Sequence, residues 1–270
     1  MTAETVIFER EGPIGRLRLN RPAKLNAQTP QMWAELRELG RTLRDEPDLR
    51  CLVVRGEGRA FSSGIDLAEI TGQDGLGAAA QVAPGAGVDR LVAMIRQGQE
   101  AFSWLVDAPF ASIAAVRGYA LGAGLQLALA CDLRIAARTT QLGALEFRYG
   151  LLPDLGGTAW LPRLVGPARA KELVFTAARI DAEEALRIGL VNRVVEDAEL
   201  DAAVGALAET IAAQPPLALR HAKRAIDAFA DQERSLQLAA EGQAACLRSE
   251  DFIEAGQAFR EGRAPVYRGR

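Results

Sequence analysis

Two glycine-rich segments have the residue types that expose backbone hydrogen-bond donors to a ligand. Residues 118–132 read GYALGAGLQLALACD, and the first N–H groups of the helix expected from about residue 124 have no partner inside that helix. They also lie at the positive end of the helix dipole, so they favour a negative charge or a developing oxyanion. Gly122, Ala123 and Gly124 let a ligand approach these donors without a bulky side chain in the way. Close packing of helix on sheet explains the small residues equally well, so both interpretations stay open.

The second segment, GRAFSSGIDLAEI at residues 58–70, follows another expected strand at 51–55. Here Ser62, Ser63 and Gly64 precede Ile65-Asp66. Two strand-exit turns with exposed N–H groups meet the requirement for an oxyanion hole to which each turn contributes one donor. Each such donor supplies about 2.7–4 kcal/mol of transition-state stabilisation. The spacing GxxxGxG in the first segment does not match a dinucleotide-binding fingerprint.

The elements that must position these turns alternate between strand and helix patterns. The expected elements are a hairpin over 5–20 around Glu11-Gly12-Pro13, a helix from Thr29-Pro30, strands at 50–56, 110–118 and 133–138, and helices over 88–106 and from about 124. This order predicts an α/β core with parallel or mixed sheets that are covered on both faces. Proteins of this class bind ligands at the carboxyl ends of their strands, which is where both glycine segments lie.

The strand patterns end near residue 195, so the sequence predicts a core over 1–195 and a helical region over 196–270 with three helical segments, the last over 235–262. Helices with broad apolar sides at a chain end often dock on another subunit, and we therefore expect an oligomer. Residues 71–87 contain many glycines and few large side chains, which is typical of a loop.

Composition excludes several classes of function. The chain has 270 residues and a net charge of -3, and its basic residues are scattered, so neither a nucleic-acid partner nor a membrane patch is expected. Cys51, Cys131 and Cys246 lie far apart, which indicates free thiols and a cytoplasmic protein without a targeting segment. With one histidine and no cysteine cluster, no metal site is expected. The partner is therefore expected to be a small molecule.

Five segments, taken together, resemble one known family. RPAKLNA (21–27), AFSSGIDL (60–67), RGYALGAGLQLALACDLRIAA (117–137), LGALEFRYGLLPDLGGTAWLPRLVG (142–166) and IDAEEALRIGLVNRVV (180–195) follow the pattern of the enoyl-CoA hydratase/isomerase (crotonase) family in order and spacing. The resemblance implies a crotonase (ClpP-like) spiral of repeated β-β-α units with a C-terminal helical trimerisation region. It also implies homotrimers or homohexamers and an acyl-CoA thioester substrate, with coenzyme A as part of the substrate and no separate cofactor.

The resemblance also implies roles for individual residues. The oxyanion donors fall on the backbone N–H groups of Ile65 and Ala123, which polarise the thioester carbonyl. The residues implied in substrate or CoA binding are Ser63, Gly64, Ile65, Leu67, Gly122 and Gln126.

The side chains around a thioester enolate select the reaction. A family hydratase resembling this chain uses one glutamate at the position of Gln126 and another at that of Glu146. An amide cannot exchange a proton near neutral pH, and loss of a general acid–base group forfeits about 10²–10⁴ in rate. Glu146, preceded by apolar residues that favour a raised pKa, and Asp154 match positions at which family isomerases carry carboxylates. An isomerase that shifts a double bond is therefore our first expectation.

Several alternatives remain open. Asp154 fits the cap of the following helix, Gln126 fits the edge of a core, and Asp66 fits a turn-fixing role. An enoyl-CoA hydratase with an altered acid/base set and a catalytically weak acyl-CoA-binding homologue are the alternative functions. A serine-protease mechanism through Ser62 or Ser63 would need His221, which we expect on the solvated face of a tail helix.

Overall fold

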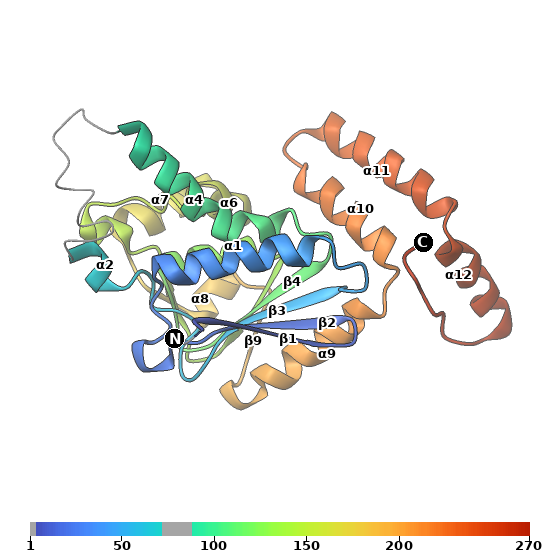
Figure 1. Cartoon of the computed structure of the whole chain (residues 1–270), viewed down its shortest axis with the longest axis horizontal. Coiled ribbons are helices and arrows are strands. Elements are labelled where there is room, and N and C mark those ends of the chain that lie inside the picture. Colours follow the sequence, from blue (N-terminus) through green and yellow to red (C-terminus); the bar gives the residue numbers. More distant parts are fainter. Residues whose placement is uncertain (1–3, 72–87) are drawn as a thin grey trace.

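The computed structural model describes residues 4–71 and 88–270, and a sheet of six strands lies at its centre (Figure 1). The strand order is β1-β2-β3-β4-β6-β9, with β1 antiparallel to β2 and the other neighbours parallel. The strands are β1 (Val6–Glu11), β2 (Ile14–Leu19), β3 (Cys51–Gly56), β4 (Ala111–Val116), β6 (Leu133–Ala137) and β9 (Arg193–Val195). Helices cover both faces of this sheet, so β3 and β4 read as nearly unbroken apolar runs.

A second sheet of three strands is formed by segments that follow strands of the first sheet. It consists of β5 (Tyr119–Leu121), β7 (Gln141–Gly143) and β8 (Ile180–Asp181), in that order. β4 is followed by β5 and a helix, and β6 is followed by β7 and a helical turn, so two successive turns of the chain each give one strand to each sheet.

The strand expected at 110–118 is confirmed as β4, which ends at Val116, but the chain then turns into β5, a short strand that the sequence did not predict. Gly118 makes this turn possible. Its φ is +63°, and a Cβ there would lie 2.1 Å from the carbonyl oxygen of Arg59.

Helices of the core begin close to the residues that the sequence signals predicted. Thr29 caps the first helix by accepting a hydrogen bond from Met32 N at 3.3 Å. The helices are α1 (Pro30–Arg44), α2 (Leu67–Thr71), α4 (Val88–Val106), α5 (Ala123–Ala130), α6 (Gly157–Val165), α7 (Pro167–Thr176), α8 (Ala182–Arg187) and α9 (Leu200–Ala212). Three 3-10 turns join them: η1 (Pro22–Lys24), η2 (Glu146–Tyr149) and η3 (Asp197–Glu199). Among the described residues, no helix combines the length and the apolar character needed to cross a membrane.

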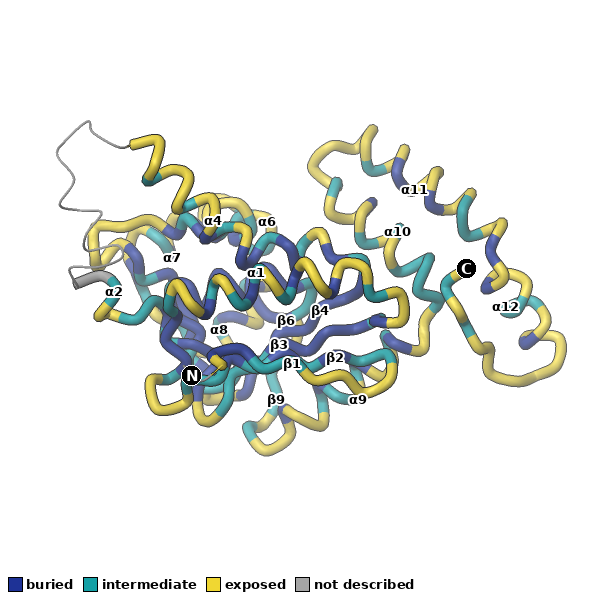
Figure 2. The backbone as a smooth tube through the Cα atoms, in the orientation of Figure 1, coloured by how far each residue is buried: buried dark blue, intermediate teal, exposed yellow. Residues whose placement is uncertain are grey.

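Two apolar layers hold the central sheet. One contains the packed helices α1, α4 and α5, with the fully buried rings of Phe61 and Phe102. On the opposite face α9 packs on β3, β4 and β6 through Leu200, Val204 and Ala208 (Figure 2). A fully buried leucine or phenylalanine side chain contributes about 1.5–3 kcal/mol, so both layers matter for stability.

The last three helices stand away from the sheet at one end of the molecule (Figure 1). They are α10 (Pro216–Asp227), α11 (Gln232–Leu247) and α12 (Glu250–Glu261), and we call residues 216–261 the arm. The single helical segment expected at 235–262 is wrong, because Ser249 starts α12 by accepting a hydrogen bond from Phe252 N at 3.1 Å. Within the predicted region 196–270, α9 thus covers the sheet and only the later helices project. Of the loop expected at 71–87, residues 72–87 lie outside the described residues.

Candidate active site

The two glycine segments meet at the carboxyl ends of β3 and β5. Gly64 has a φ of +101°, and a Cβ on it would lie 2.8 Å from the carbonyl oxygen of Leu121. Gly122 has a φ of +52°, and a Cβ on it would lie 4.0 Å from the Cα atom of Gly64. Both positions need a positive φ, and Gly64 also needs the absent side chain, so glycine at these two positions favours the close approach of the two turns.

The two predicted donors are among the backbone groups that these turns leave unused. Gly64 O accepts from Gln28 N at 2.7 Å, and Gly122 N donates to Gly143 O at 2.8 Å. Within the described residues, the N–H groups of Ile65 and Ala123 have no hydrogen-bond acceptor. Ala123 is also the first residue of α5, where helix geometry leaves N–H groups free. The arrangement suits an oxyanion held between the two turns.

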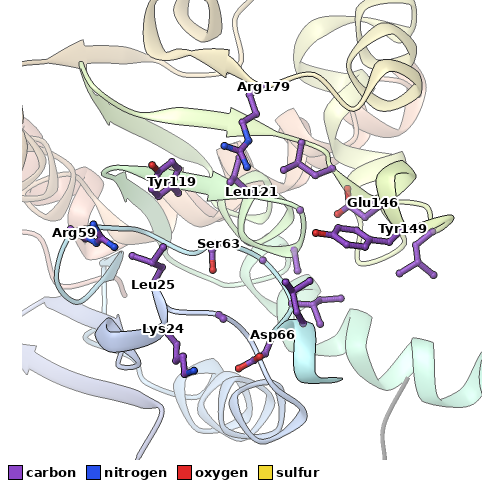
Figure 3. A pocket seen from close by; sticks show the side chains of 18 residues that line it. Lys24, Leu25, Arg59, Ser63, Asp66, Tyr119, Leu121, Glu146, Tyr149 and Arg179 are labelled. Atoms are coloured by element: carbon purple, nitrogen blue, oxygen red, sulfur yellow. The ribbon is translucent and has the colours of Figure 1, made fainter. Parts of the chain in front are cut away.

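An open cleft of about 600 Å³ lies over these donors (Figure 3). Of the predicted residues, those that line it are Ser63, Gly64, Ile65, Leu67, Gly122, Ala123 and Glu146. Leu121 and Leu145 add apolar surface, so the cleft has the mixed lining that small-molecule sites usually have.

Sequence reasoning did not single out several side chains of the cleft. Lys24, Arg59 and Arg179 line it, and Figure 3 shows Lys24 and Arg59 on the side opposite Glu146 and Tyr149. Lys24 and Arg59 lie inside or beside quoted motifs, but single basic residues in loops carry no periodic signal. Two of the three cations of the cleft thus lie across it from Glu146.

Asp66 fixes the turn beside the cleft, which is the role that the sequence analysis suggested for it. Its carboxylate forms a salt bridge of 2.9 Å with Arg21 and accepts from Ala68 N at 3.2 Å. Burial raises the pKa of Asp66, but these hydrogen bonds and the charge of Arg21 outweigh it, so the pKa lies below its usual value. Asp66 therefore stays ionised and structural.

Glu146 is the buried acid of the cleft, placed by η2 immediately after the apolar Leu145. Its side chain is 7% exposed, and Oε1 accepts from Nε2 of Gln126 at 2.8 Å. Oε2 is buried and has no hydrogen-bond partner among the described residues. A Cβ at Gly122 would lie 3.4 Å from Oε1, so the carboxylate is next to the donor turns. Burial raises the pKa of Glu146, and the charge of Asp154 adds to this effect.

Gln126 lies behind the cleft wall instead of in it. Its side chain is 1% exposed, and its Oε1 accepts from Gly157 N at 2.9 Å. It is not among the residues that line the cleft. This placement does not support the predicted direct contact between Gln126 and the substrate. It does support a contact between Gln126 and Glu146.

Asp154 also lies outside the cleft wall, and burial raises its pKa. The capping alternative is wrong, because α6 begins at Gly157 with Gly156 as N-cap and no side-chain cap bond. Gly156 has a φ of +110°, so the chain enters the helix through a left-handed residue, and Asp154 lies two residues before the cap position. The backbone carbonyl of Asp154 accepts from Gln99 of α4 at 2.7 Å.

The residues of a serine–histidine mechanism are not brought together. The hydroxyl of Ser62 is fully buried and donates to Asn26 O at 2.8 Å. His221 lies in α10 of the arm, where it is half-buried against Gly242 of α11 instead of on a solvated face. Across residues 4–71 and 88–270, no group of three or more His, Cys, Asp or Glu side chains is placed to hold a metal ion.

Comparison with known proteins gives consistent similarities. The family model for enoyl-CoA hydratase/isomerase matches residues 9–270. A crotonyl-CoA hydratase of Syntrophomonas wolfei is 37% identical over 266 residues, covering 97% of each chain. An enoyl-CoA hydratase crystal structure from Bacillus anthracis has a TM-score of 0.88 at 35% identity, covering 99% of this chain and 100% of that one. A protein from Thermobifida fusca YX, solved in complex with CoA, has a TM-score of 0.82 at 42% identity, covering 94% and 95%.

Proposed function

This chain belongs to the enoyl-CoA hydratase/isomerase family, and on that premise we propose that it shifts a double bond in the acyl group of an acyl-CoA thioester, with Glu146 carrying the proton. The resemblance of the five sequence segments is confirmed, and so is the crotonase-type spiral fold. The chain is accordingly an acyl-CoA enzyme of this family, and the proposal concerns which reaction it performs.

One observation carries the proposal: a single buried carboxylate lies beside two free backbone donors. The N–H groups of Ile65 and Ala123 bind the thioester oxygen as negative charge develops on it. Glu146 then removes a proton from the carbon next to the thioester and returns it further along the chain. Its raised pKa brings its basicity closer to neutral pH, where proton transfer is most effective.

Basic side chains on the cleft wall support a CoA thioester as the substrate. Lys24, Arg59 and Arg179 present three cations on the cleft wall. Phosphate groups bind to lysine and arginine through charge-assisted hydrogen bonds. We propose that these side chains hold the phosphates of CoA while Ser63, Gly64 and Leu67 lie along the rest of it.

We propose that Asp154 acts on the reaction through Glu146 and not as a second proton carrier, since its charge contributes to the raised pKa of Glu146. Because Asp154 does not line the cleft, Glu146 is the group that we assign to both proton transfers.

A hydratase is the second candidate, favoured by the names of relatives such as the crotonyl-CoA hydratase that is 37% identical. The position of Gln126 argues against a hydratase. Its amide oxygen accepts from Gly157 N, its NH₂ group donates to Glu146, and it lies outside the cleft wall. It is therefore poorly placed to hold the water that a second glutamate would hold. A third candidate is an acyl-CoA-binding protein without turnover.

A panel of 2-enoyl, 3-enoyl and saturated acyl-CoA thioesters in deuterated water separates the three candidates. A double-bond shift changes ultraviolet absorbance at constant mass apart from deuterium uptake, hydration adds D2O and so about 20 mass units, and a binding protein changes neither. We expect the shift with wild type and Asp154→Asn, the latter slower, and its loss in Glu146→Gln. Exchange that is equal in wild type and Glu146→Gln would remove Glu146 from the mechanism. The same panel run after dialysis against a chelator tests whether any cofactor beyond CoA is needed.

We also propose that the arm joins subunits into trimers or hexamers in the cytoplasm. Its exposed large apolar residues include Leu236, Leu247, Phe252, Ile253 and Phe259. Exposed large apolar side chains that recur on two neighbouring helices are typical of an interaction surface. Light scattering after size-exclusion chromatography, with Phe259→Asp and Ile253→Asp as variants, tests the assembly, and cell fractionation tests the location.

A further inference from the structure

A chain of buried hydrogen bonds connects the start of α6 to the proposed catalytic acid. Gly157 N donates to Oε1 of Gln126 at 2.9 Å, and Nε2 of Gln126 donates to Oε1 of Glu146 at 2.8 Å. Gln126 is almost completely buried and does not line the cleft. Its influence on the reaction must therefore pass through Glu146.

The orientation of the Gln126 amide follows from its partners. A backbone N–H can only donate, so the amide oxygen faces Gly157 and the NH₂ group faces Glu146. In the flipped orientation two donors would oppose each other and the amide oxygen would oppose the carboxylate. Gln126 can thus donate to Glu146 but cannot take its proton, whereas a glutamate in this place could share one.

This hydrogen bond acts against the effect of burial. A donor stabilises a carboxylate more than a neutral carboxyl group, because the bond is then charge-assisted. The donor is itself polarised, since Gly157 is the first residue of α6 and its N–H lies at the positive end of that helix. Burial raises the pKa of Glu146 and the bond from Gln126 lowers it, and burial is the larger effect, so the bond limits a net rise.

We propose that Gln126 is a positioning residue that holds the carboxyl group of Glu146 beside the donor turns in its proton-accepting form. The proposal rests on the proposed function and deepens it. In the reaction, the C–H bond at the α carbon of a 3-enoyl thioester breaks and its electron pair enters the dienolate. The proton passes to Glu146 and returns to the γ carbon, so the double bond moves without any other reactant.

The decisive variant is Gln126→Met, which keeps the length of the side chain and removes the donor. The pKa of Glu146 is read directly by ¹³C NMR titration of labelled glutamate, with Glu146→Gln to assign the signal. We expect the midpoint in Gln126→Met to rise by about one unit, the size of one charge-assisted hydrogen bond. The acid limb of kcat/KM should move to higher pH with it, so that kcat/KM falls by up to about tenfold on the acid side of the midpoint and recovers at higher pH. KM should stay close to wild type, since Gln126 does not line the cleft.

Gln28→Met is the matched control. Gln28 is fully buried like Gln126, but its side chain donates to Ser62 Oγ and Ala123 O, both at 3.3 Å. Its loss should lower stability without moving the Glu146 titration.

An unchanged Glu146 midpoint in Gln126→Met overturns the positioning role, and so does a rise in KM at constant kcat. A wild type that exchanges no proton overturns the proposed function instead, and the NMR midpoint still decides the role of Gln126.

Discussion

Two largely buried acids in this protein are paired in opposite ways. At the joint between core and arm, Oδ2 of Asp132 accepts from Ser112 N at 2.7 Å, from Ser112 Oγ at 2.9 Å and from Lys223 Nζ at 3.0 Å. In the cleft, Glu146 accepts one hydrogen bond at Oε1 and none at Oε2 within the described residues. An acid surrounded by donors is stabilised as a fixed charge, whereas an acid with a bare oxygen costs stability and is available for chemistry.

The Asp132 joint has a clear structural purpose. Lys223 of α10 also donates to the carbonyls of Leu105 at 2.9 Å and Phe110 at 3.2 Å, and its side chain is 8% exposed. One ammonium group thus satisfies two carbonyls and one carboxylate, and it fastens the arm to the core. Glu146 has no comparable cation, which leaves it sensitive to its surroundings.

The largest effect is expected for Glu146→Gln, which tests the acid of the cleft. The variant should lose a factor of about 10²–10⁴ in double-bond shift, because an amide cannot take the proton. It should unfold no more easily than wild type, because glutamine still accepts from Gln126 and carries no buried charge. Deuterium exchange at the α carbon and calorimetry measure the two quantities. A variant that loses stability along with activity would mean that Glu146 is structural like Asp132.

The next effect is expected for Lys223→Met, which tests the other acid. The change leaves Asp132 without its cation and two carbonyls without a donor, so the free energy of unfolding should fall by about 2–4 kcal/mol. Denaturant titration measures this loss. Activity per folded molecule should stay within about twofold of wild type, since Lys223 does not line the cleft. A catalytic loss as large as that of Glu146→Gln would contradict the division between the two acids.

The sequence predicted the backbone part of the site better than its side chains. Gly64 and Gly122 were placed correctly because positive φ and close approach select glycine. Gln126 was expected at the cleft but lies behind it. All residues of α5 are buried, so the helix has no amphipathic pattern that could tell which face Gln126 occupies. The short strand β5 was missed because its three residues lie in the glycine segment that was interpreted as a turn.

A smaller effect is expected for Gln126→Glu, which changes the pairing of Glu146 without removing it. The new carboxylate can still accept from Gly157 N, but it can face Glu146 only by sharing a proton. Because residue 126 lies behind the cleft wall, this second carboxylate cannot hold a water against the substrate, so we expect no hydration product above the wild-type level. The double-bond shift should instead slow by about tenfold at neutral pH, because a shared proton makes Glu146 less available as a base. Ultraviolet absorbance and mass spectrometry measure the two products, and a hydrated product in this variant would show that position 126 reaches the substrate.

The smallest effect is a pH dependence of stability with a definite sign. Burial raises the pKa of Glu146 above its usual value of about 4.5, so ionisation is easier in the unfolded chain. The stability that this group contributes is complete below pH 4.5 and is lost as the pH rises through the raised pKa. Glu146→Gln has no such loss, so its Tm relative to wild type should increase between pH 4 and pH 7, with each kcal/mol worth about 2–4 °C. Asp132→Asn, which gives up a charge that faces Lys223, should instead lower Tm at pH 7. Opposite signs at neutral pH would separate the two acids thermodynamically, and a Tm difference for Glu146→Gln that shrinks as pH rises would contradict the raised pKa.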